Sequence, residues 1–128
     1  MPFDWLEFFT LAQELALRGD EASKRTAISR AYYFVFHLAY VRAVRNCGPK
    51  PSGPPPTHAW CWEKFINTAD AGCAALGVEG DRLKQLRHRV DYKNGTIQRL
   101  DEVCQRMIMD VQHFHADFVA LNARFPTP

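Results

Sequence analysis

The chain has 128 residues, enough for one domain that encloses a single hydrophobic core without help from metals or disulfides. Hydrophobic residues make up 47% of it and charged residues 23%, which is typical of a globular protein and excludes disordered and fibrous classes. The formal net charge of +2 by itself indicates no class of partner. We therefore predict a single domain over residues 1–128.

Two helices are predicted in the first part of the chain. Large and small apolar residues recur at helical spacing from Trp5 to Ala16 and stop at Gly19, which suits a helix end. Asp20 can cap a second helix that continues without glycine or proline through Asn46. The middle of this helix is apolar on all sides, which predicts that it packs against several neighbours. The segment GPKPSGPPP, residues 48–56, must be a loop.

Three further helical segments follow the proline-rich loop. Thr57 can cap a short helix over His58 to Thr68. A poorly defined stretch follows around Gly72 to Gly80, and Asp81 can then cap another helix that runs through Lys93 and ends at Asn94 and Gly95. Thr96 opens a last helix, whose apolar stripe extends from Ile97 to Leu121. No segment alternates with period two, so no strand is expected. These elements predict an all-α fold, an antiparallel up-and-down bundle of four to five helices.

Several kinds of chemistry find no support in the sequence. The four cysteines include no CxxC pair and no nearby histidine at zinc-finger spacing. No uncharged run approaches the ~20 residues that span a bilayer, and the start of the chain lacks the pattern of a signal peptide. A di-metal bundle needs two Glu-x-x-His pairs, whereas only Asp110 with His113 comes near that pattern. We expect a cytoplasmic protein with reduced thiols, no membrane segment, no metal and no cofactor.

Arg30 and His37 are unusual because they flank six uncharged residues in the most apolar part of the second helix. Two helical turns separate them, so both side chains lie on one face and share one environment. One interpretation is structural: Arg30 forms a buried ion pair with Asp91, beside Tyr92, and His37 is a hydrogen-bonded core or interface histidine. The other is that both contact a phosphate or a reacting group, and the two interpretations can coexist.

Other candidate residues are aromatic or basic. Tyr33 is either a core aromatic residue or a substrate contact. His58 opens the third helix, where free amides favour anions, so it is either a surface residue or a phosphate contact. Residues 82–89 form a basic helix face that is either solvated surface or a nucleic-acid footprint, with Arg87 and Arg89 as the substrate-binding candidates.

Three segments together resemble the HEPN domain family: RTAISRAYYFVFHLA at residues 25–39, THAW at 57–60 and LRHRVDY at 86–92. The resemblance covers about residues 5–120. It implies a helical bundle, usually a homodimer, from prokaryotic stress, defence or toxin-antitoxin systems, often beside a minimal nucleotidyltransferase. Many members are metal-independent ribonucleases that use an arginine followed, after four to six residues, by a histidine. Arg30 and His37 fit this spacing and become the catalytic candidates.

The chemistry of such a pair is plain. A histidine can take a proton from a ribose 2′-hydroxyl or give one to the leaving oxygen, while an arginine binds the phosphate and stabilises its developing charge. A dimer would supply two histidines to one cleft. Two functions therefore remain open: an RNA- or nucleotide-interacting ribonuclease or ribonuclease-derived toxin, and a non-catalytic helical module that docks a nucleotidyltransferase or another protein.

Overall fold

The computed structural model describes residues 2–128, and this part of the chain contains five α-helices and no strand. The helices are α1 (Leu6–Ala16), α2 (Glu21–Cys47), α3 (Thr57–Ile66), α4 (Ala71–Tyr92) and α5 (Leu100–Ala120). The predicted all-α bundle is thereby confirmed. Within residues 2–128, no helix has both the length and the apolar character needed to cross a bilayer.

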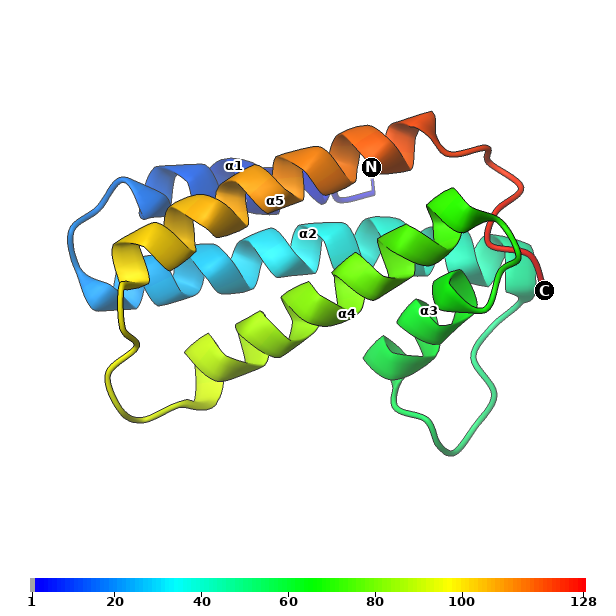
Figure 1. Cartoon of the computed structure of the whole chain (residues 1–128), viewed down its shortest axis with the longest axis horizontal. Helices are drawn as coiled ribbons and strands as arrows, with labels where there is room; N and C mark the ends of the chain where they lie inside the picture. Colours follow the sequence, from blue (N-terminus) through cyan, green and yellow to red (C-terminus); the bar gives the residue numbers. More distant parts are fainter. Residues whose placement is uncertain (1) are drawn as a thin grey trace.

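Helix α2 lies at the centre of the bundle and contacts each of the other four helices. Figure 1 shows α1 and α5 along one side of α2, with α4 and the shorter α3 on the other side. This position explains why the middle of α2 is apolar all round, since residues such as Ile28, Tyr32 and Val35 are fully buried. The predicted stripe of α5 also packs on the core, through Met107, Val111 and others.

The ends of α2 agree with the sequence. The Asp20 carboxylate accepts a hydrogen bond of 2.9 Å from the Ser23 amide, as an N-cap should. Gly48 follows the last helical residue with a φ of 81°, a conformation that favours glycine. The loop over residues 48–56 is present as predicted.

The start of α4 was predicted wrongly. Its N-cap is Asp70, which accepts a 2.9 Å bond from the Cys73 amide, while Asp81 lies within the helix. The glycines that suggest a break are helical because α3 packs directly on them. A Cβ atom on Gly80 would stand 2.3 Å from the Trp62 ring, and one on Gly77 would stand 2.7 Å from Ile66.

Two other helix boundaries also differ from the prediction. Helix α3 begins at Thr57 itself, with Pro56 in the cap position and no side-chain cap. Helix α5 begins at Leu100 rather than after Thr96, because the preceding Arg99 has a left-handed φ of 54°. Ile97 therefore contributes to the core, with 3% exposure, from the connection between α4 and α5.

Candidate functional site

Tyr33 brings together four of the side chains that the sequence singles out. The Arg30 guanidinium lies 4.7 Å from the Tyr33 ring centroid, and Arg87, from α4, lies 5.2 Å from it. The rings of His37 and His58 lie 6.1 and 6.0 Å from the same ring. We call these five residues the Tyr33 cluster. It joins α2, the start of α3 and the middle of α4.

Arg30 does not pair with Asp91, so the predicted ion pair is wrong. Asp91 instead lies 3.4 Å from the Arg87 guanidinium, one turn earlier on the same helix, and accepts a 3.1 Å hydrogen bond from the Ser29 hydroxyl. Asp91 thus still connects α4 with α2, through Ser29. Arg30 is half-buried against the rings of Phe8 and Tyr33, and it makes no ion pair or hydrogen bond with any residue at 2–128.

His37 stacks on an aromatic ring of the N-terminal segment. Its ring lies 3.6 Å from the Trp5 ring, with an angle of 9° between the planes, and is half-buried. Burial lowers the pKa of His37 below 6.5, and the nearby charge of Arg30 lowers the pKa further. The imidazole is therefore neutral at pH 7. It lines a small hollow of about 250 Å³ with Trp5 and Arg45, and Arg30 is not among the residues that line this hollow.

His58 is held by a chain of two hydrogen bonds. The Trp62 indole N–H donates to the Tyr32 hydroxyl at 3.1 Å, and that hydroxyl lies 2.6 Å from His58 Nδ1. Burial raises the pKa of Tyr32, so the hydroxyl keeps its proton. Because this hydroxyl already accepts from Trp62 and has no other partner within residues 2–128, its O–H is oriented toward Nδ1, which accepts the hydrogen bond. His58 consequently carries its own proton on Nε2. Burial, followed by the charges of Arg87 and Lys84, lowers its pKa to about 4.

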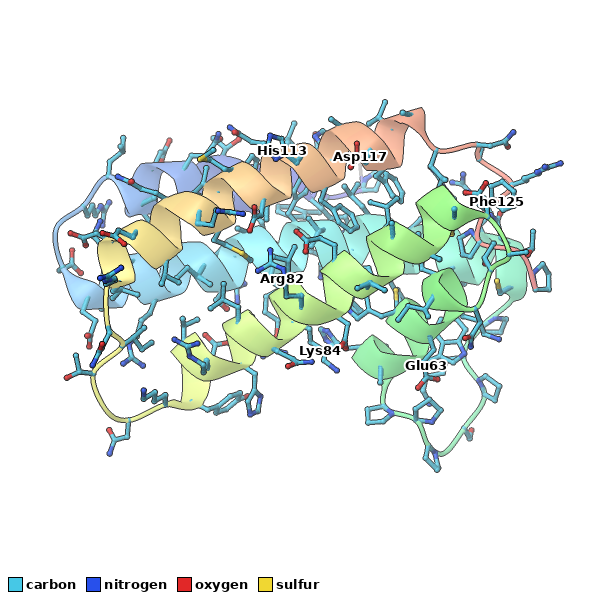
Figure 2. All side chains as sticks on the ribbon, in the orientation of Figure 1. Glu63, Arg82, Lys84, His113, Asp117 and Phe125 are labelled. Carbon is cyan, nitrogen blue, oxygen red and sulfur yellow. The ribbon has the colours of Figure 1, made fainter. Side chains whose placement is uncertain are left out.

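A basic hollow of about 750 Å³ lies where the start of α3 faces the middle of α4. Figure 2 shows Lys84 on the side of α4 that faces α3. Among the side chains that line this basic hollow are Pro56, His58, Lys84, Arg87, His88 and Arg89. The first amides of α3 have no side-chain cap here, and this end of a helix dipole also favours anions. The structure therefore brings three of the predicted substrate-binding residues, His58, Arg87 and Arg89, to one hollow, and the fourth, Tyr33, does not line it.

The cations of the basic hollow differ in how far they are neutralised. Lys84 lies 3.2 Å from Asp81, and Arg87 lies 3.4 Å from Asp91. Arg89 makes no ion pair within the described part of the chain. The two carboxylates do not line the hollow, whereas all three cations do. The hollow is thus positively charged and suits an anionic ligand.

Two residues that the sequence singles out do not have the roles expected of them. Arg82 was predicted to lie on the basic face, but it points toward α5, where it bonds Asp110 at 2.6 Å (Figure 2). It also bonds Glu79, one turn earlier on α4 itself, at 2.6 Å. Tyr92 was predicted to have a structural role, yet its side chain is 68% exposed and its ring lies 4.7 Å from that of His88. Helical spacing marks Tyr32 as a core aromatic residue with a bonded hydroxyl, which it is, but does not reveal that the hydroxyl joins Trp62 to His58.

No group of three or more His, Cys, Asp or Glu side chains among residues 2–128 is arranged to hold a metal ion. Comparison of the chain with protein-family models, curated proteins and solved structures finds no match. The HEPN resemblance therefore stays a prediction that rests on the three segments at residues 25–39, 57–60 and 86–92.

Proposed function

We propose that this protein binds the phosphates of RNA in the basic hollow between α3 and α4. The observation that carries the proposal is the convergence of Lys84, Arg87 and Arg89 with His58 on one hollow of about 750 Å³. Cationic side chains that line a groove supply most of the affinity of sequence-independent nucleic-acid binding. With Nδ1 bonded to Tyr32, His58 offers its Nε2 proton to a phosphate oxygen while the ring stays neutral.

The test is the affinity of a labelled single-stranded RNA, measured by fluorescence anisotropy in EDTA. The double variant Lys84→Gln/Arg89→Gln should bind at least about tenfold more weakly, because a hydrogen bond to a charged group contributes ~1.5 kcal/mol or more. Arg124→Gln is the control, since Arg124 packs over Phe125 in the C-terminal tail and does not line the hollow. Equal affinities for the double variant and the control would refute binding at this site.

A second candidate function is metal-independent cleavage of the bound RNA by Arg30 and His37. It is favoured by one observation: Arg30 lies against Phe8 and Tyr33 without a carboxylate partner, and the nearby His37 is neutral. A neutral imidazole can take the proton of a 2′-hydroxyl, while a free guanidinium can stabilise the phosphorane-like transition state. The proton that His37 takes up is then given to the leaving 5′-oxygen, which completes the transfer.

Cleavage is tested with single-stranded RNA in EDTA. His37→Ala should abolish cleavage and leave affinity unchanged, because the histidine moves protons and adds little to binding. Arg30→Ala should weaken both, since it removes a phosphate contact and transition-state stabilisation together. If the wild-type protein binds RNA but leaves it intact, the cleavage proposal fails and a non-catalytic binding module is the better description.

A further inference from the structure

An exposed aromatic ring adjoins the basic hollow at the carboxyl end of α4. Tyr92 is the last residue of α4, and its side chain is 68% exposed, so it adds little to the core. Its ring contacts that of His88 at 4.7 Å, and His88 lines the basic hollow. Tyr92 also lines a second hollow, of about 490 Å³, together with Lys93 and Asn94. The ring therefore stands between two hollows of the surface.

This arrangement combines the two features that single-stranded nucleic-acid sites use. One is a positively charged groove that follows the phosphates, and the other is an aromatic face on which an unpaired base stacks. The Tyr92 ring lies 4.7 Å from the ring of His88, which lines the basic hollow, so the aromatic face and the cationic groove adjoin. A strand with phosphates in the basic hollow can thus place a nearby base at Tyr92.

We propose that Tyr92 is a stacking platform for an unpaired nucleobase of a single strand whose phosphates occupy the basic hollow. The inference rests on the proposed function and adds the class of ligand, a single strand with unstacked bases. A duplex does not fit this role, because its bases are stacked on one another and their faces are covered. The tyrosine hydroxyl is not needed for stacking, so phenylalanine should replace it.

The experiment compares two labelled oligomers that contain the same number of phosphates. One is a short oligodeoxyadenylate, which 2′-hydroxyl attack cannot cleave, and the other is the matching abasic oligomer. The wild-type protein should bind the base-bearing oligomer about 5- to 150-fold more tightly, which is the effect of one stacked base. Tyr92→Ala should lose this preference while keeping its affinity for the abasic oligomer. Tyr92→Phe should retain the preference.

Val119→Ala is the matched control, because Val119 is 69% exposed on α5 and lines neither hollow. It should bind both oligomers as the wild-type protein does. Equal affinity of the wild-type protein for the two oligomers, or a base preference that survives in Tyr92→Ala, would overturn the stacking role alone. A wild-type protein that binds neither oligomer and also fails to bind the labelled single-stranded RNA would overturn the proposed function as well, so the two failures are distinguishable.

Discussion

The Tyr32 hydroxyl forms hydrogen bonds with two other side chains, Trp62 and His58. It is fully buried, accepts a hydrogen bond from the Trp62 indole and donates one to His58 Nδ1. Buried polar groups need such partners, because an unpaired donor in the core costs its full desolvation energy. The same hydroxyl that satisfies the Trp62 donor also selects the tautomer of His58. The core residue Tyr32 thus leaves His58, in the basic hollow, with its proton on Nε2.

Replacement of Tyr32 by phenylalanine should therefore lower the free energy of unfolding by about 1–3 kcal/mol, because the buried Trp62 N–H loses its acceptor. The measurement is urea denaturation followed by tryptophan fluorescence. Tyr40→Phe is the control, since Tyr40 packs on Phe36 and Trp60 through its ring. Equal urea midpoints for the two variants would contradict the assigned role of the Tyr32 hydroxyl.

The histidines of the Tyr33 cluster predict a loss of stability in weak acid. The pKa of His58 is about 4 in the folded chain and close to 6.5 when unfolded, so the unfolded chain alone takes up a proton between these values. The contribution of His58 to stability is therefore complete above pH 6.5 and declines as the pH falls toward 4. His37, whose pKa is also lowered, acts in the same direction.

Urea midpoints measured from pH 7.5 to pH 4.5 should decrease in the wild-type protein and decrease less in His58→Gln. Asp20 also has a lowered pKa, but it loses its contribution only as the pH falls below its ordinary value of 3.8, outside this window. A wild-type midpoint that is constant over the window would show that His58 is protonated in the folded chain.

The sequence predicts which side chains share a helix face better than it predicts which side chains they contact on other helices. Helical periodicity placed Arg30 and His37 on one face, and both do contact Tyr33. It could not show that the Asp91 carboxylate would pair with Arg87, one turn earlier on the same helix, rather than with Arg30. Which residues face each other across two helices depends on helix rotation and crossing angle, and a single sequence does not specify these.

At the scale of the helices, the error in α4 has a single physical origin. Glycine lowers helix propensity by about 1 kcal/mol relative to alanine, so Gly72, Gly77 and Gly80 suggested an irregular segment. Tertiary packing outweighs that cost, because the absence of a Cβ at Gly77 and Gly80 lets α3 lie directly on α4. The helices that were predicted well, α2 and most of α5, instead contain no glycine.

The two candidate caps of α4 allow a direct test. Asp70→Ala should cost about 1 kcal/mol of stability, because it removes the 2.9 Å bond to the Cys73 amide at the true start of the helix. Asp81→Ala should cost under about 0.5 kcal/mol, because it removes only an exposed hydrogen bond from Gln85 and a surface ion pair with Lys84. Chemical denaturation measures both. If Asp81→Ala proved the more damaging variant, α4 would begin where the sequence suggested.

At the scale of the whole molecule, the net charge of +2 conceals two unlike surfaces. The hollow between α3 and α4 is basic, whereas a hollow of about 380 Å³ between α4 and α5 is lined by Glu79, Asp110 and Asp117. Helix α4 separates the two, and its cations divide accordingly: Arg82 faces the acidic side and Lys84 the basic side (Figure 2). Because Arg82 and Arg106 pair with Glu79 and Asp110, the basic hollow is the face that attracts a polyanion.

This separation predicts a specific dependence of RNA binding on salt. For a single strand, the logarithm of the association constant falls with the logarithm of salt concentration at a slope of about −0.7 for each phosphate contacted. Lys84→Gln and Arg89→Gln should each make the slope shallower by about 0.7, since each removes one cation from the basic hollow. Arg82→Gln, on the opposite side of the same helix, should leave the slope unchanged because its charge is already held by Glu79 and Asp110. Titrations of labelled RNA at several salt concentrations measure all three slopes. A change in slope for Arg82→Gln equal to that for Lys84→Gln would mean that the RNA responds to total charge rather than to this hollow.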